Sequence, residues 1–172
     1  MVFIRYVSVK PKTSEFNMLI RRYQAEDNKE VKDLHYAGLA QFGASKDPYH
    51  DSDLDDIEGI YINNTGDFLV GTEENEIVAM GAIKKVTASR GEIKRIRVRR
   101  EYQRRGYGQT ILSRLVELAV ELGYTELCLD STDNNAAAQG LFEKCGFNET
   151  HRGKIGIYDL VFYRKKLNEG GK

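Results

Sequence analysis

The positions of apolar residues predict a chain in which strands and helices are interleaved. Apolar residues recur every three or four positions after Asp27, and again over 111–122 and 134–145, which is typical of helices. Gly123 and Gly146 stand where the last two helices would end. The pattern predicts an α/β (α+β) fold. The runs typical of strands occupy residues 19–23, 68–71, 77–83, 92–98, 125–130, 147–151 and 155–167.

The apolar residues of the predicted strand 92–98 do not all lie on one face. Ile93, Ile96 and Val98 do not share one parity along the strand. This pattern indicates either a strand that is covered on both faces or a bulge near Lys94 and Arg95. A bulge would open backbone groups to a ligand.

The loop that follows this strand carries the features of an anion site. Gly106 and Gly108 let the backbone turn its N–H groups toward one point, and the N-terminus of the next helix adds its positive dipole end there. We expect a phosphate-bearing ligand at this point, with side-chain charge converging on it from the arginines at positions 97, 99, 100, 104 and 105.

Composition narrows the class of protein. The 172 residues are 41% apolar, which suits one domain, expected over 18–167, with an N-terminal extension or extra edge strand over 1–17 and a disordered tail over 168–172. Lys plus Arg equals Asp plus Glu at 26 each, so no overall field favours nucleic acid or an anionic membrane. No run approaches the roughly 18 apolar residues of a spanning helix, and no long apolar leader is present. We therefore expect a soluble cytoplasmic protein.

The two cysteines, Cys128 and Cys145, lack CxxC spacing and a nearby histidine cluster. We expect both to be reduced and buried, with no disulfide and no metal site.

An acidic cluster between residues 47 and 58 has two readings. Ser52 is a suitable N-cap, and the aspartates at 53, 55 and 56 would then lie in the first turn of a helix, where the helix dipole favours them. The alternative is a rim that attracts a cationic substrate such as an amine. His35, on the preceding helix, is expected to be partly exposed rather than a ligand.

Two sequence motifs indicate which class of phosphate-binding protein the chain resembles. A Walker loop is absent, and Ile111 stands where a Rossmann fingerprint needs a third small residue. Residues 103–108 instead match Q/R-x-x-G-x-G/A, and residues 135–147 match N-x-x-A-x-x-L-[YF]-x-K-x-G-F. With both motifs in this order, the chain from about 18 to 167 resembles the GCN5-related N-acetyltransferase (GNAT) superfamily.

The resemblance implies a mixed, mostly antiparallel sheet of about six or seven strands, flanked by about four helices. The sheet would be splayed between the strand ending at Val98 and the strand ending near Asp130, with acetyl-CoA in the splay. The residues that it implies for acetyl-CoA are Ile96, Arg97 and Val98 at the acetyl and pantetheine arm, Gln103, Arg104, Arg105, Gly106, Tyr107, Gly108 and Gln109 around the pyrophosphate, and Asn135, Phe142 and Lys144 beside the arm.

Acetyl transfer to an amine needs a base, and two carboxylates are candidates. Glu92 lies eleven residues before Gln103, as the catalytic glutamate does in histone-type lysine acetyltransferases, and is our first choice. Asp130 lies five residues before Asn135, where ribosomal-protein alanine acetyltransferases carry a glutamate base, and is the second. The alternatives are a solvent-facing strand residue for Glu92 and a capping or turn role for Asp130.

Phe142 departs from the family pattern. Many members have a tyrosine there that is proposed to protonate the leaving thiolate, although histone-type members also carry phenylalanine. Tyr158 is a possible substitute acid, against a packing role. We predict an acetyl-CoA-dependent N-acetyltransferase (EC 2.3.1 class) for a small-molecule or peptide amine, as monomer or homodimer, with no nucleic acid or membrane partner. The alternative is an acyl-CoA-sensing module without turnover.

Overall fold

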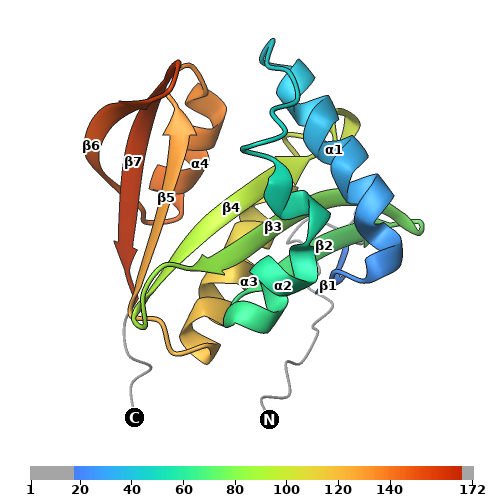
Figure 1. Ribbon diagram of the computed structural model, residues 1–172, viewed down its shortest axis with the longest axis horizontal. Helices are drawn as coiled ribbons and strands as arrows, with labels where there is room; N and C mark the ends of the chain where they lie inside the picture. Colours follow the sequence, from blue (N-terminus) through green and yellow to red (C-terminus); the bar gives the residue numbers. More distant parts are fainter. Residues whose placement is uncertain (1–17, 168–172) are drawn as a thin grey trace.

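The computed structural model describes residues 18–167 and arranges them as one sheet with helices on both faces (Figure 1). The expectations for residues 1–17 and 168–172 fall outside the described residues. The strands are β1 (Leu19–Arg22), β2 (Asp67–Glu73), β3 (Glu76–Lys85), β4 (Arg90–Val98), β5 (Glu126–Thr132), β6 (Asn148–Ile155) and β7 (Tyr158–Lys166). The α-helices are α1 (Asn28–Ala40), α2 (Ile57–Ile60), α3 (Tyr107–Glu121) and α4 (Ala136–Lys144), and short 3-10 helices include η2 (Ser52–Asp55).

The sheet has the order β1-β2-β3-β4-β5-β7-β6 and is antiparallel except between β4 and β5. These two strands pair only where residues 90–92 meet residues 126–128, and beyond that point they diverge (Figure 1). We call this opening between the remainder of β4 and of β5 the fork. The predicted mixed, mostly antiparallel and splayed sheet is therefore confirmed.

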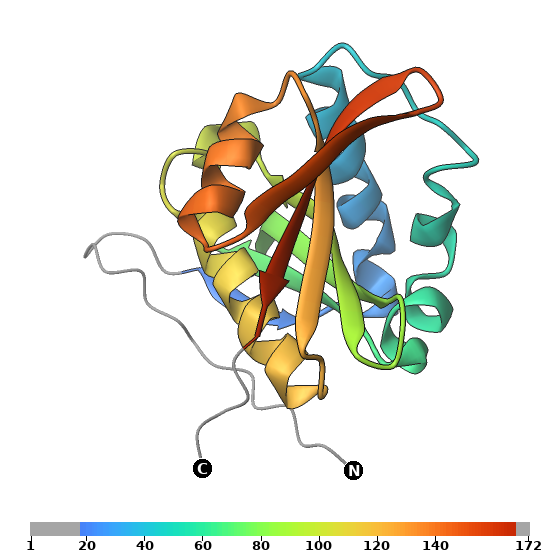
Figure 2. The same ribbon diagram turned by 90° about the vertical axis from the view of Figure 1, so that its left-hand side faces the viewer.

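The helices divide between the two faces of the sheet (Figure 2). Helices α3 and α4 lie on one face, where apolar side chains such as Ile111, Leu115 and Phe147 form the larger core. Helices α1 and α2 lie on the other face, over β2, β3 and β4, around Leu54, Tyr61 and others. No helix of residues 18–167 covers that second face over β5, β7 and β6 (Figure 2), so the sheet is open there.

Strand β4 contains the bulge that was one of the two sequence-based alternatives. Met80 pairs with Arg97 and Ala82 pairs with Lys94, so Gly81 faces two residues of β4. Arg95, within the bulge, has a φ of 59°, a conformation that L-residues seldom adopt. The bulge directs the Arg95 side chain toward α1 and the segment that follows it.

Arg95 is the centre of a buried polar cluster. Its Nε donates to Asp53 Oδ2 at 2.9 Å, and its Nη1 donates to Asp51 Oδ1 at 3.1 Å. His35 Nε2 lies 2.9 Å from the same Asp51 oxygen, and the Tyr61 hydroxyl donates to Asp53. We call these five residues the Arg95 cluster. It joins α1, η2 and the end of α2 to the bulge of β4.

The Arg95 cluster corrects two sequence-based expectations. His35 is buried, with 1% of its surface exposed, rather than partly exposed, because its ring fills the space between α1 and Asp51. Asp56, and not Ser52, is the N-cap of a helix: it accepts from Gly59 N at the start of α2. The acidic segment is largely committed to structure, since Asp55 also pairs with Lys32.

The last two strands, the cysteines and the helices also bear on the sequence-based expectations. Ile155 ends β6 instead of beginning the last strand, because Gly156, with a φ of 59°, turns the chain there. Cys128 and Cys145 are unpaired, as expected, and both are half-buried. Within residues 18–167, no helix is both long and apolar enough to cross a membrane.

The Arg95 cluster generates a prediction about stability. Arg95→Leu leaves two buried carboxylates without their cation, so we expect the free energy of unfolding to fall by about 3–5 kcal/mol. Arg90→Leu is the matched control on the same strand, where the Arg90–Glu126 pair is about one third exposed at the arginine, and it should cost at most about 1 kcal/mol. Urea unfolding measures both; equal losses would contradict a special role for the cluster.

A second prediction concerns acid. Burial, together with the charges of Arg97 and Arg95, lowers the pKa of His35 to about 4 from its ordinary 6.5, although Asp51 acts in the opposite direction. Between these values the unfolded chain binds a proton that the folded chain does not, so stability falls as the pH drops from 6.5 to 4, by about 3 kcal/mol. His35→Gln should flatten this slope, and His50→Gln, at an exposed histidine, should not. An unchanged slope in His35→Gln would refute the assignment.

Candidate functional site

The free edge of β4 offers backbone groups at the fork. Arg99 N donates to Val78 O on the β3 side, and alternation along a strand then turns the N–H groups of Ile96 and Val98 away from β3. The carbonyls on that free edge are occupied, since Ile96 O accepts from Arg97 Nη1 at 2.8 Å and Val98 O accepts from Gln103 Nε2 at 3.0 Å. What remains on the edge is a pair of donors, suited to a ligand that carries amide or thioester carbonyls.

The N-terminus of α3 is open to an anion. The first intrahelical bond runs from Thr110 N to Gly106 O, so the N–H groups of Gly108 and Gln109 have no acceptor within the helix. No side chain of residues 18–167 caps this end, whereas Asp56 caps α2 and Asn135 caps α4. Donors at the positive end of a fifteen-residue helix have the chemistry that a phosphate group requires.

The two glycines of the loop serve different needs. Gly106 has a φ of 85°, and a Cβ placed there would meet nothing within 4 Å, so the space above it is open. Gly108 is partly buried, and a Cβ there would stand 3.3 Å from Leu141 Cδ2 and 3.6 Å from Val98 Cγ2. The expected clearance for a ligand therefore applies at Gly106, while Gly108 allows α3 to approach α4 and β4.

The buried side chain of Tyr107 fixes the loop to the protein interior. Its side chain is buried, its hydroxyl donates to Glu73, and its ring stacks on Tyr102 with 6.0 Å between centroids. Burial and the Glu73 carboxylate raise the pKa of this hydroxyl, which stays protonated. Tyr107 can therefore meet a phosphate only through its backbone.

The five arginines do not all point to this loop. Arg100, Arg104 and Arg105 are exposed around it. Arg99 instead donates to Ile77 O at 3.0 Å, and Arg97 lies so close to α1 that a Cβ on Gly38 would be 2.7 Å from its Cδ. The expectation that all five side chains converge on the ligand is wrong for Arg97 and Arg99, because Arg97 on β4 and Arg99 directly after it both face α1.

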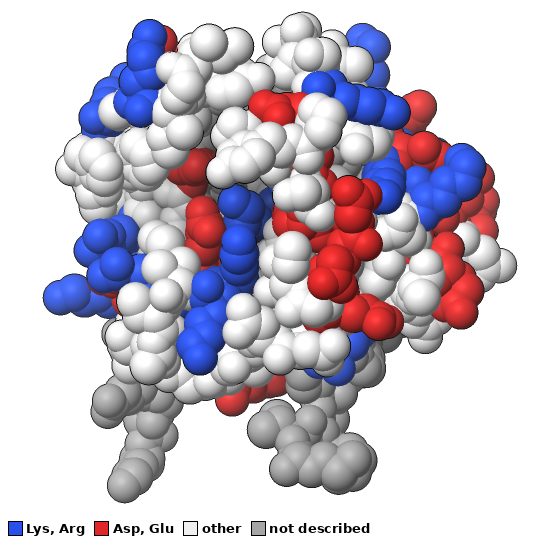
Figure 3. All heavy atoms as spheres, viewed as in Figure 1, with Lys and Arg blue, Asp and Glu red and all other residues white. Residues whose placement is uncertain are grey.

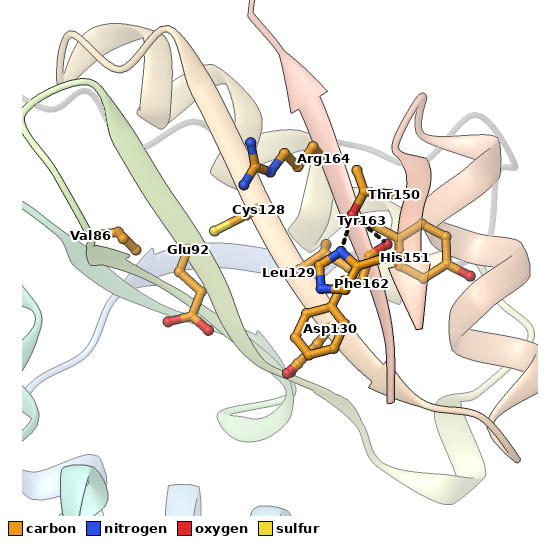
Figure 4. A pocket seen from close by; sticks show the side chains of 10 residues that line it. All are labelled: Val86, Glu92, Cys128, Leu129, Asp130, Thr150, His151, Phe162, Tyr163 and Arg164. Carbon is orange, nitrogen blue, oxygen red and sulfur yellow. Dashed lines mark hydrogen bonds between the residues drawn. The ribbon is translucent and has the colours of Figure 1, made fainter. Parts of the chain in front are cut away.

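A hollow of about 240 Å³ lies at the base of the fork, on the face that no helix covers (Figure 4). It brings together the two predicted bases, Glu92 from β4 and Asp130 from β5. Basic and acidic side chains lie together in the groove at this face, and acidic ones gather on the α1 and α2 half (Figure 3). The hollow is lined by Val86, Glu92, Cys128, Leu129, Asp130, Thr150, His151, Phe162, Tyr163 and Arg164.

The groups in the hollow differ in their electrostatics. Glu92 Oε1 lies 3.8 Å from Lys94 Nζ. Asp130 is reached by solvent from one side, yet the surrounding walls raise the pKa of its carboxyl above the ordinary value, while Lys94 opposes the rise. Burial and then Glu92 raise the pKa of the Cys128 thiol to about 11, so it is a thiol rather than a thiolate near neutral pH.

Other residues of the hollow were not predicted as site residues from the sequence. His151 stacks flat on Phe162, with 4.4 Å between centroids and 2° between planes, and its Nδ1 lies 3.0 Å from Thr150 Oγ1. Arg164 lies on the same face, in register with Cys128. Only the pairing of β5, β7 and β6 brings these residues beside Glu92, and that register is not readable from any one strand.

The other predicted residues lie outside the hollow. Phe142 is buried, with its ring 5.9 Å from Tyr163 and 6.4 Å from Phe147. Asn135 Oδ1 accepts from Ala138 N at 3.1 Å, and Lys144 is exposed at the end of α4.

Tyr158 is the first residue of β7, exposed at the tip of the β6–β7 hairpin, opposite Ile155. It is not among the residues that line the hollow. Its acid role stays a prediction.

Solved structures share this architecture. An acetyltransferase of the GNAT family from Staphylococcus aureus Mu50 superposes with a TM-score of 0.82 at 21% identity, covering 88% of this chain and 99% of that one. The yncA protein of Salmonella typhimurium, a putative acetyltransferase solved with its cofactor acetyl-CoA, gives 0.73 at 21% identity, over 90% and 96%.

A curated relative and a family model extend the likeness to sequence. The [ribosomal protein bS18]-alanine N-acetyltransferase of Escherichia coli K12 is 32% identical over 94 residues, which are 54% of this chain and 64% of that enzyme, so the match spans under two thirds of the relative. The model of the acetyltransferase (GNAT) family matches residues 29–147. With more than half of its length matched, and with the fork, the uncapped α3 and the sheet order in place, the chain belongs to the GNAT acetyltransferase family.

Proposed function

We propose that this protein is an acetyl-CoA-dependent N-acetyltransferase that acetylates a primary amine in the hollow. One observation carries the proposal: the free edge of β4 leads from the uncapped N-terminus of α3 to a hollow that holds two carboxylates, Glu92 and Asp130. A phosphate site and a candidate base are thus joined by unpaired backbone donors.

The residues from the N-terminus of α3 along the free edge of β4 suit successive parts of acetyl-CoA. Backbone N–H groups of Gly108 and Gln109, with the exposed Arg104 and Arg105 beside them, would hold the diphosphate. The N–H groups of Ile96 and Val98 would pair with the peptide-like arm, as an added strand does at a sheet edge. Acetyl-CoA supplies the acetyl group as an activated thioester.

We propose Glu92, on β4, as the base. Asp130 lies across the fork, on β5. The amine binds as an ammonium ion, and Glu92 takes its proton directly or through a water. The amine nitrogen then bonds to the acetyl carbon and the carbon–sulfur bond breaks. The second proton that the nitrogen loses passes, directly or through water, to the departing CoA thiolate. The Val98 N–H would stabilise negative charge on the carbonyl oxygen during the transfer.

The protonated thiol of Cys128 favours direct transfer of the acetyl group from acetyl-CoA to the amine. Cys128 Sγ lies in the hollow, 3.7 Å from Gly91 O. With a pKa of about 11, its thiol is a poor nucleophile near neutral pH, which disfavours an acetyl-cysteine relay.

The test is release of the CoA thiol from acetyl-CoA with a panel of primary amines. We expect turnover by the wild type and a loss of about 100-fold or more in kcat for Glu92→Gln, because an amide cannot take the proton. Asp130→Asn should lose less. A larger loss in Asp130→Asn would transfer the base role to Asp130.

The same assay addresses the sensor alternative. Tight binding of acetyl-CoA by calorimetry without thiol release, whichever amine is added, would overturn the proposed enzyme and favour an acyl-CoA-binding module.

Gly106 gives a prediction about the donor site. In Gly106→Ala the new methyl group occupies the open space above the α3 N-terminus, and the φ of 85° adds strain of about 1–2 kcal/mol. We expect the Kd for acetyl-CoA to rise at least about tenfold, which corresponds to about 1.4 kcal/mol. Gly140→Ala on α4, where a Cβ also meets nothing, is the matched control and should leave the Kd unchanged. Equal affinities in the two variants would argue against a diphosphate at Gly106.

A further inference from the structure

We propose that the hollow selects a small zwitterionic amine, an α-amino acid or close derivative with a free carboxylate and an apolar side chain, in preference to an amide or a peptide. The inference rests on the proposed function and deepens it.

The first observation is the order of charges across the sheet. Glu92 pairs with Cys128, and Cys128 pairs with Arg164, so the three residues form one row across β4, β5 and β7. Asp130 and Phe162 form the next row, on the same face. Figure 4 shows the Arg164 guanidinium and the Glu92 and Asp130 carboxylates lining one hollow from different sides. A ligand here meets negative charge at one end and positive charge at the other.

The opposite charges of this row stand two strands apart. Adjacent strands lie about 4.8 Å apart, so about 10 Å separates the backbones at Glu92 and Arg164. Both side chains line the hollow, so a ligand between them can donate from an ammonium to Glu92 and accept on a carboxylate from Arg164. An α-amino acid carries both groups on one carbon and is small enough for this space.

Arg164 has the capacity to bind an incoming carboxylate. Its side chain is 47% exposed, and its Nη1 lies 3.6 Å from Glu126 Oε1, beyond hydrogen-bond distance. The same Glu126 oxygen accepts a closer hydrogen bond from Arg90 Nε. The guanidinium therefore keeps donors for a carboxylate that enters the hollow, and its planar fork suits two parallel hydrogen bonds.

The wall of the hollow supplies the preference for an apolar side chain. The stacked rings of His151 and Phe162 present a flat surface, and Val86 lines the same space. The volume of about 240 Å³ is below the usual range for drug-sized ligands, about 300–1,000 Å³. These dimensions suit a single amino acid with an aliphatic or aromatic side chain.

The experiment compares matched acceptors in the thiol-release assay: L-phenylalanine, L-phenylalaninamide, 2-phenylethylamine and the peptide Phe-Ala-Ala, with the leucine series in parallel. We expect kcat/KM for the free amino acids to exceed that for each amide, amine and peptide by at least about tenfold. A site built to bind a charged group rejects analogues that lack it.

Variants assign the preference to Arg164. Arg164→Gln should bring the ratio of kcat/KM for acid over amide close to 1, mainly through a higher KM for the acid, and Arg164→Lys should retain part of it. Arg152→Gln is the matched control, because Arg152 is an exposed arginine on β6 that pairs with Glu149 and lies outside the hollow. It should keep the full ratio.

The outcomes separate this inference from the proposed function. Equal or faster acetylation of amides and peptides would overturn the zwitterion preference while the acetyltransferase stands, and so would an unchanged ratio in Arg164→Gln. No thiol release with any amine would overturn both.

Discussion

The buried charge of Arg95 is the constraint on which the rest of the structure depends. Its guanidinium bonds Asp51 and Asp53, and these residues belong to the segment that joins α1 to α2. An arginine and two carboxylates that are mostly removed from water are costly to separate. The bulge, formed by Arg95 and Ile96, lies on the part of β4 that no longer pairs with β5, next to the N–H group of Val98. One local irregularity thus joins the segment between α1 and α2 to the strand whose edge is open.

The two faces and the free edge of β4 have different roles. Ile93, Ile96 and Val98 pack against the core under α3, while Glu92, Lys94 and Arg95 lie on the other face. The free edge between the faces has backbone donors and no partner strand. Because one nine-residue strand serves all three purposes, the proposed donor and acceptor sites hold a fixed distance from each other.

Local patterns predicted much of this arrangement, and long-range register accounts for what they missed. The glycine loop and the start of α3 depend on neighbours in sequence and were predicted, while the bulge near Arg95 was one of two alternatives that the pattern left open. The burial of His35 depends on Asp51, sixteen residues away, and the direction of Arg97 depends on Gly38. His151 and Arg164 reach Glu92 only through pairing across β5, β7 and β6, which no single strand encodes.

The fork has a consequence for folding thermodynamics. Only three residue pairs join β4 to β5, so the two parts of the sheet meet through a short parallel contact and the shared core under α3. A molecule that pairs with the free edge completes this ladder, and it binds only the folded chain. Mass action then couples folding to its concentration: a ligand at a hundred times its Kd adds about 2.7 kcal/mol to the free energy of unfolding. The free energy of unfolding therefore depends on the concentration of the ligand that binds the open edge.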